Sequence, residues 1–168
     1  MPLPKSFSFS VRDLTAELHF NPKTGQIVNA RRRSNHKKGD LAGGPRVSKE
    51  NGIYYWRIYL FGREHQAHRL MYYAATGKDP GHLYVDHINQ DTLDNRIENL
   101  RLVTIKENNN NKRIYGSKKV MNEGVKLLDN GLYQISIENY IYPKLYEKLP
   151  DAIRARYSLL HNYYSLKQ

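Results

Sequence analysis

The chain has 168 residues, no cysteine, and 27 Lys and Arg residues against 16 Asp and Glu, which gives a formal net charge of +11. The lack of cysteine excludes disulfides, a thiolate zinc site and a cysteine nucleophile, and no apolar run approaches the roughly 18 residues of a membrane span. The composition therefore predicts an intracellular protein with no need of a membrane or an oxidising compartment, whose first candidate partner is a polyanion.

The positive charge is concentrated on the flanks of the sequence. Residues 1–60 have a net charge of +7 and residues 117–168 a net charge of +3, whereas residues 61–116 have only +1. The acidic residues of the middle segment include Asp86, Asp91 and Asp94. A carboxylate near a phosphate backbone is useful where a divalent cation bridges the two. The pattern favours a metal-dependent nuclease over a simple nucleic-acid binder, although we interpret Asp91 and Asp94 as ordinary loop residues.

The first sixty residues predict a small β-rich module. A strand is expected over residues 14–20, a turn at residues 21–25 (NPKTG) and a returning strand over residues 26–30. Residues 53–61 (IYYWRIYLF) are the clearest strand, and we expect their aromatic side chains to pack in the sheet and core rather than offer a stacking platform. A basic loop lies between these strands. It can either contact phosphate or be a solvated segment, and we give the two interpretations equal weight. Its basic residues include Arg31, Arg32, Arg33, Lys37 and Lys38.

The middle of the chain predicts a short helix followed by a strand–loop–strand–helix unit. The helix covers residues 66–76, and Gly77 is placed to end it. A strand over residues 82–88, a polar loop over 89–99 and a second strand over 100–103 follow. The pattern Thr104-x-x-Glu107 is a capping box that opens a helix to about residue 114.

Four residues of this unit can form a site for metal-assisted hydrolysis. Asp86 and His87 are adjacent, so on a regular strand they face opposite ways unless a bulge or the strand end turns one of them. Asn99 ends the loop, and Asn108 falls where a helix can face back toward the first strand. Two protein oxygens plus phosphate are sufficient for a hard divalent cation. The imidazole is then free to act as a base.

These residues resemble the HNH (ββα-metal) endonucleases, and their surroundings resemble the phage-type homing and nicking enzymes in particular. The resemblance covers roughly residues 16–112. It is carried by the words Asn21-Pro22-x-Thr24-Gly25, Ala67-His68-Arg69-Leu70, Val85-Asp86-His87-Ile88, Asp94-Asn95-Arg96, Asn99-Leu100-Arg101 and Glu107-Asn108.

The resemblance implies a role for each of these residues. His87 would be the general base for the attacking water, and Asp86 with Asn108 would bind one divalent ion at the scissile phosphate. Asn99 would tie the loop across the two strands so that His87 is aimed correctly. Arg96 would hold the loop rather than touch phosphate. His68 also lies in a family-like word, but we interpret it as a hydrogen-bonded packing residue beneath the loop rather than as a ligand.

One position departs from the signature residues His, Asn and His that give the family its name. Asn108 stands where the third signature residue is histidine, and an amide oxygen points to magnesium or manganese over zinc or nickel. The run of asparagines leaves the register open, with Asn111, one turn on, as the alternative ligand. Lys112 and Arg113 follow directly and are predicted to contact DNA together with the basic loop.

Residues 117–168 predict a separate module of three short strands and a helix. The strands are expected over residues 125–128, 133–138 and 140–146, with a hairpin turn at 129–131 (DNG). Asp151 is expected to cap a helix to about Tyr164, whose buried stripe is Ile153, Tyr157 and Leu160. This segment faintly resembles the DNA-binding domain of plant ethylene-response factors, but it lacks that family's dense arginine and tryptophan pattern. DNA reading and simple packing therefore both stay open.

Together these patterns predict an α+β chain of three parts: an N-terminal β module (residues 1–65), a ββα-metal module (66–116) and a C-terminal sheet-plus-helix module (117–168). We expect a monomeric, phage-encoded homing-type endonuclease that nicks or cuts double-stranded DNA in the cytoplasm of an infected host. A single ββα motif attacks one strand at a time, which favours nicking or sequential cutting. The alternatives are an inactive HNH-derived DNA-binding protein and a nonspecific nuclease.

Overall fold

The computed structural model describes residues 4–33, 35–49, 52–114 and 122–167, and the side chains of residues 110–114 lie outside this description. Its elements, in chain order, are α1 (Val11–Glu17), β1 (Leu18–Asn21), β2 (Gln26–Asn29), β3 (Gly44–Val47), β4 (Tyr54–Leu60), β5 (Arg63–Gln66), α2 (Ala67–Thr76), β6 (Tyr84–His87), the short 3-10 helix η1 (Ile97–Asn99), β7 (Leu100–Val103), α3 (Ile105–Ile114), β8 (Val125–Leu127), β9 (Tyr133–Ile137), β10 (Tyr140–Tyr146) and α4 (Leu149–Leu166).

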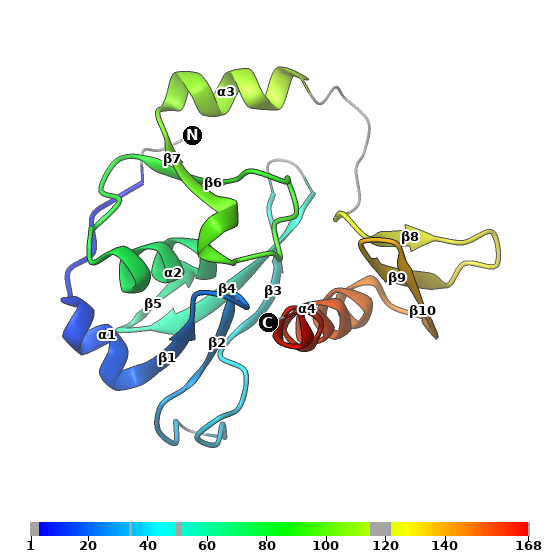
Figure 1. Cartoon of the computed structure of the whole chain (residues 1–168), viewed down its shortest axis with the longest axis horizontal. Helices are drawn as coiled ribbons and strands as arrows, with labels where there is room; N and C mark the ends of the chain where they lie inside the picture. The colour runs from blue at the N-terminus through cyan, green and yellow to red at the C-terminus, as the bar shows by residue number, and fades with distance from the viewer. Residues whose placement is uncertain (1–3, 34, 50–51, 115–121, 168) are drawn as a thin grey trace.

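The strands form four small antiparallel sheets, β1-β2, β3-β4-β5, β6-β7 and β10-β9-β8. Helix α4 lies between the β3-β4-β5 sheet and the β8-β9-β10 sheet, while α3 lies at the edge of the molecule over β6 and β7 (Figure 1). The predicted α+β class is confirmed. No helix in the described part of the chain is long and apolar enough to cross a membrane.

The N-terminal segment begins with a helix where a strand was predicted. The Ser10 hydroxyl accepts the Asp13 N–H at 3.1 Å, and the Asp13 carboxylate accepts the Ser10 N–H at 3.0 Å. This reciprocal cap starts α1, and strand pairing begins only at Leu18. The prediction of a strand over residues 14–20 was therefore wrong for residues 14–17, because local capping decides the conformation there.

Strand β4 divides the central sheet into a core face and an outer face. Trp56, Ile58 and Leu60 alternate into the core, each about 1% exposed, whereas Tyr59 on the other face is 63% exposed. The Trp56 indole donates to the Ala42 carbonyl at 2.7 Å. Packing in the core is thus the role of Trp56, as predicted, but Tyr59 presents its ring to solvent.

The C-terminal segment has the predicted three strands and helix. The helix begins at Leu149, after Lys148 at the N-cap position, with Pro150 in the first turn, where a missing N–H costs nothing. Asp151 therefore lies inside the first turn, and its prediction as the cap was wrong. Ile153, Tyr157 and Leu160 are at most 2% exposed, which confirms the predicted buried stripe.

One hydrophobic core joins the three segments that the sequence separates. Its members include Leu14 and Ile27 from the first segment, Leu70 from the second, and Ile135 and Tyr157 from the third. The ring of Tyr157 on α4 stacks on Trp56 of β4 with a centroid distance of 3.6 Å. The division at residues 65 and 116 stays a prediction, since all three parts contribute to this one core.

The turn between β1 and β2 is pressed against the polar loop that follows β6. The Ile97 N–H donates to the Pro22 carbonyl at 2.9 Å. Gly25 has a φ of +76°, and a Cβ added there would lie 2.8 Å from both the Arg96 nitrogen and the Asn95 carbonyl carbon. Only glycine satisfies both the backbone angle and the close approach.

We expect Gly25→Ala to destabilise the fold by more than about 1 kcal/mol, because it adds a backbone clash to the strain of a left-handed conformation. The measurement is the free energy of unfolding in urea. Gly39→Ala is the matched control, since Gly39 also has a positive φ of +87° but nothing within 4 Å of an added Cβ. Equal losses in the two variants would mean that the turn does not press on the loop.

Candidate active site

Residues 84–114 form the predicted strand–loop–strand–helix unit. Strands β6 and β7 pair with Asp86 opposite Arg101 and His87 opposite Leu100. The Thr104 N–H donates to the Glu107 carboxylate at 2.7 Å, and the Glu107 N–H donates to the Thr104 hydroxyl at 3.3 Å, which confirms the predicted capping box. Helix α3 packs against both strands (Figure 1).

His87 is held inside the unit by two neighbours. Its Nε2 lies 3.0 Å from Oδ1 of Asn95. Its ring packs edge-on against the buried ring of His68, with centroids 4.8 Å apart. Burial lowers the pKa of His87, and the hydrogen bond with Asn95 and the nearby carboxylates only partly oppose this. His87 is therefore neutral at pH 7, which is the form that can accept a proton.

His68 packs against His87, and its predicted role as a hydrogen-bonded residue beneath the loop stays a prediction. It is buried at 4% exposure, and besides His87 its ring contacts that of Tyr55, with centroids 6.0 Å apart. Burial lowers the pKa of His68 well below its usual value, and the neighbouring His87, Arg69 and Arg57 lower it further. A positive charge on His68, beside His87, is thereby disfavoured.

Asp86 is more exposed than His87, as the alternation of a regular strand requires. Its Oδ2 accepts from Nε of Arg101 at 3.1 Å and from Nη2 at 2.9 Å, across the β6-β7 pair. A cation bound by Asp86 would therefore share this carboxylate with Arg101.

Asn108 is half-buried in α3, where its backbone N–H bonds to the Thr104 carbonyl at 2.9 Å. Its helix packs against β6, the strand that carries Asp86. Carboxylate and amide oxygens fit a hard divalent ion whose other ligands are water and phosphate. No group of three or more His, Cys, Asp and Glu residues within the described ranges is placed to hold a metal. The side chain of Asn111 lies outside the described residues, so the choice between Asn108 and Asn111 stays a prediction.

Asn99 connects the two ends of the loop. Its Nδ2 donates to Oδ1 of Asn89 at 2.9 Å and to the Asp94 carbonyl at 2.8 Å, and its Oδ1 accepts the Asn89 N–H at 2.9 Å. Asn99 is only 5% exposed, and its side chain makes all three of these hydrogen bonds. It therefore fixes the path of the chain between β6 and β7. This is the geometry that the implied loop-tying role requires.

Asp94 and Arg96 form a compact ion pair within the loop. Arg96 donates from Nε and Nη2 to the two carboxylate oxygens of Asp94 at 2.9 and 2.8 Å, and it also pairs with Glu98. The guanidinium lies 3.6 Å from the ring centroid of Tyr164 on α4. Arg96 is thus engaged inside the protein, with a side chain 19% exposed.

Asp91 is bound by the C-terminal helix. Arg156 donates from Nη1 and Nη2 to its two oxygens at 3.0 and 2.6 Å, and the Nε of Arg156 donates to the Ser136 carbonyl at 2.8 Å. Both side chains are nearly fully buried. Asp91 and Asp94 are loop residues, as predicted, but they are buried and ion-paired rather than solvated.

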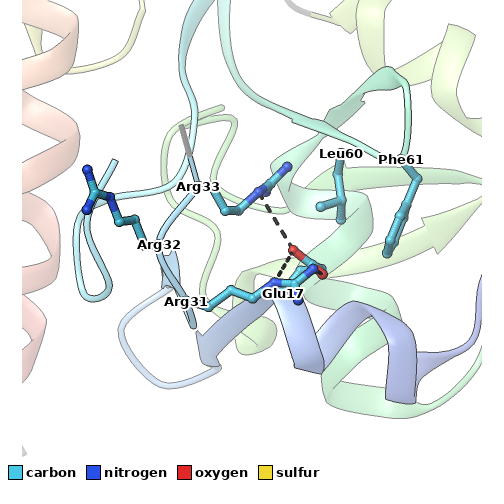
Figure 2. A pocket seen from close by; sticks show the side chains of 6 residues that line it. All are labelled: Glu17, Arg31, Arg32, Arg33, Leu60 and Phe61. Carbon is cyan, nitrogen blue, oxygen red and sulfur yellow. Dashed lines mark hydrogen bonds and ion pairs between the residues drawn. The ribbon is translucent and has the colours of Figure 1, made fainter. Parts of the chain in front are cut away.

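The predicted basic loop is partly neutralised by Glu17. Figure 2 shows Arg31 and Arg33 turned toward this carboxylate and Arg32 directed away from it. The Nε of Arg31 donates to Glu17 at 3.1 Å, and Nη2 of Arg33 donates to the Tyr59 carbonyl at 3.0 Å. This loop lies at the opposite end of the molecule from α3 (Figure 1).

The remaining predicted DNA contacts divide between these two ends. Lys37 and Lys38 are exposed in the basic loop. Lys112 and Arg113 lie in α3, and their side chains are outside the described residues. The structure therefore does not gather all the predicted basic residues on one surface.

Sequence reasoning missed the groups that orient the site. Asn95 belongs to a family-like word, but no role was assigned to it. Arg101 could have been found as the cross-strand partner of Asp86 once the register was known. Arg156 and Tyr164 carry no local signal, because they lie about 65 to 70 residues beyond the loop that they contact.

Comparison with known proteins identifies the family of the middle segment. The family model described as HNH endonuclease matches residues 65–110. Over 73 residues the chain is 38% identical to an uncharacterized HNH endonuclease of Acanthamoeba polyphaga mimivirus, with 43% of this chain and 37% of that protein aligned. The chain thus spans just over a third of the length of this curated relative.

A solved structure that concerns DNA binding and cleavage by the HNH homing endonuclease I-HmuI is similar with a TM-score of 0.43 and 23% identity, over 71% of this chain and 62% of that one. The family match encloses the whole candidate site, from His68 to Asn108. Residues 65–110 of this chain form an HNH endonuclease domain.

Proposed function

We propose that the protein is a metal-dependent endonuclease that hydrolyses phosphodiester bonds of double-stranded DNA. The observation that carries the proposal is the imidazole of His87, kept neutral and hydrogen-bonded inside a ββα unit that matches the HNH family. The viral relative is consistent with a viral source, and we propose action by a monomer in the cytoplasm of an infected host.

The chain's own groups divide the work of hydrolysis. With Nε2 donating to Asn95, Nδ1 of His87 has the lone pair that takes a proton from the attacking water. Asp86 and Asn108 would hold one magnesium or manganese ion, which supplies charge stabilisation at the scissile phosphate and the leaving 3′ oxygen. Arg101 holds the Asp86 carboxylate in place beside the strand end.

The DNA contacts of the proposal come from the exposed basic residues. Arg32, Lys37 and Lys38 would bind phosphates at one end of the molecule, and Lys112 with Arg113 would do so near α3. Arg31 and Arg33 contribute less, since Glu17 offsets part of their charge. A single ββα unit attacks one strand at a time, which favours nicking over a concerted double-strand cut.

The first test is cleavage of supercoiled plasmid carrying viral DNA inserts, in magnesium, in manganese and in EDTA. We expect metal-dependent conversion to open circles, and a loss of about 100-fold or more in rate for His87→Ala because the general base is removed. His82→Ala is the control, since His82 is exposed and bonds to the Pro4 carbonyl at 2.9 Å, away from the loop.

Three results would change different parts of the proposal: the activity itself, the expected homing-type specificity, or the role of His87. DNA bands that are retarded in a gel-shift experiment but not cleaved would indicate an inactive DNA-binding protein. Degradation of every DNA to small fragments would indicate a nonspecific nuclease. Full activity of a folded His87→Ala variant would remove His87 as the base.

Asp86→Ala and Asn108→Ala test the cation site. We expect each to raise the magnesium concentration needed for half-maximal cleavage by about 10-fold or more, because each removes one of two protein oxygens from the ion. The measurement is a magnesium titration of the nicking rate. If the magnesium requirement rises in Asn111→Ala but not in Asn108→Ala, the ligand is Asn111, one turn further along α3.

Replacing Arg32, Lys37 and Lys38 together with Ala tests the basic loop as a phosphate-binding surface. We expect a plot of the logarithm of the DNA association constant against the logarithm of the salt concentration to become shallower. Its slope should change by about 0.9 for each phosphate that the loop no longer neutralises. Fluorescence anisotropy with a DNA duplex at several salt concentrations measures this slope. Arg12→Ala is the control, since Arg12 is exposed on α1. An unchanged slope in the triple variant would make the loop a solvated segment.

A further inference from the structure

Gln90, three residues after His87, has a backbone conformation that glutamine rarely adopts. Its φ is +65°. In this left-handed region the Cβ of an ordinary residue lies close to the following carbonyl oxygen, so glycine is the usual choice. Within the described part of the chain, nine glycines have a positive φ, against three other residues, Phe61, Gln90 and Glu138. A glutamine at position 90 therefore carries a conformational cost that glycine would avoid.

The hydrogen bonds of the loop impose this conformation on Gln90. Its N–H donates to the His87 carbonyl at 3.1 Å, which closes a turn directly after β6. Before it, the Asn89 N–H donates to Oδ1 of Asn99 at 2.9 Å. After it, the Asp91 N–H donates to Oδ1 of Asn89 at 2.9 Å. Both neighbours of Gln90 are thus fixed, and its backbone cannot relax without breaking the loop that follows the catalytic strand.

Side-chain contacts account for the other two exceptions but not for Gln90. The ring of Phe61 packs on that of Phe9, with centroids 4.7 Å apart. The Glu138 carboxylate accepts from the Tyr163 hydroxyl at 2.5 Å. The side chain of Gln90 is exposed, and it makes no hydrogen bond to the other described residues. Within the described structure, nothing offsets the cost of a glutamine at this position.

The exposed part of this turn adjoins the proposed catalytic residues. Ile88, which directly follows His87, is 49% exposed although it is apolar. Ile88 and Gln90 are thus both open to solvent within four residues of Asp86. A glutamine amide can donate to and accept from base edges, an apolar side chain can contact a thymine methyl group, and the amide can also bond to phosphate. DNA bound for cleavage at His87 would pass within reach of this turn.

We infer that Gln90 is a DNA-contact residue whose amide hydrogen-bonds to the DNA next to the scissile phosphate. A partner outside the protein accounts for a glutamine where the backbone favours glycine. The inference rests on the proposed function, because it takes the DNA to lie at His87.

Two substitutions separate the amide from the backbone. Gln90→Gly removes the amide and relieves the backbone, whereas Gln90→Ala removes the amide and keeps the Cβ. With limiting protein and magnesium, we expect nicking of the supercoiled plasmid to slow by about 3- to 10-fold in both variants, because each loses a hydrogen bond to DNA. The urea midpoint of unfolding should rise only in Gln90→Gly. Asn139→Ala, which removes an exposed amide in the turn between β9 and β10, is the control and should change neither quantity.

Mapping the nicked positions by primer extension distinguishes the two kinds of DNA group. Loss of a base preference beside the nick would identify a base edge as the partner of Gln90. An equal loss of rate at every position would identify a phosphate. Both results support the contact.

A wild-type nicking rate in both variants would overturn the inference. A slow Gln90→Gly variant with a normal Gln90→Ala variant would overturn it too, because the effect would then come from the backbone. A lower urea midpoint for Gln90→Gly would mean that the glutamine serves the fold, which also overturns it.

The affinity for a DNA duplex, measured by fluorescence anisotropy, separates this inference from the proposed function. If the wild type binds DNA without cleaving it, the proposed nuclease activity fails. Binding that is about 3- to 10-fold weaker in both variants would then leave the inference standing, and unchanged binding would overturn it. A wild type that neither binds nor cleaves DNA would overturn both.

Discussion

The ion pair between Asp91 and Arg156 is the interaction on which the rest of the site depends. It crosses from the polar loop of the HNH domain to α4, and the same guanidinium reaches the Ser136 carbonyl of β9. Burying two charges is costly. The bidentate hydrogen bonds between Arg156 and Asp91 offset this cost, and the Nε–H of Arg156 is also hydrogen-bonded. The pair therefore specifies one position for the loop against the C-terminal segment.

Around this pair, the loop is held from several directions at once. The turn at Pro22 contacts it from the N-terminal side, and the Thr92 hydroxyl donates to the carbonyl of Tyr54, the first residue of β4, at 2.7 Å. The Nδ2 of Asn122 donates to the Thr92 hydroxyl at 2.7 Å. A loop with this many buried polar contacts has few alternative conformations. The imidazole of His87 is hydrogen-bonded to this loop through Asn95, so the loop also restricts the orientation of the imidazole.

Much of the fold and part of the site follow from local sequence. The ββα unit could be predicted from alternation and from the Thr104–Glu107 capping box, because both are decided by residues close in the chain. The same reasoning failed at residues 14–17, where the cap at Ser10 was overlooked. Contacts such as Asp91 with Arg156 could not be predicted, because charge alone does not select one partner 65 residues away. The residues proposed for the chemistry could be picked out from the sequence, whereas the residues that contact and orient them could not.

The dependence of the loop on α4 also orders the steps by which the protein is made. Synthesis runs from the N-terminus, so the residues of the ββα unit leave the ribosome well before Arg156 and Tyr157 do. Until then the loop lacks Arg156, the partner of Asp91, and Tyr164, whose ring lies against the guanidinium of Arg96. Contacts between residues so far apart in sequence also form late in folding, because loop closure must precede them. The loop after β6 therefore takes its final conformation only when α4, the last helix, docks against it.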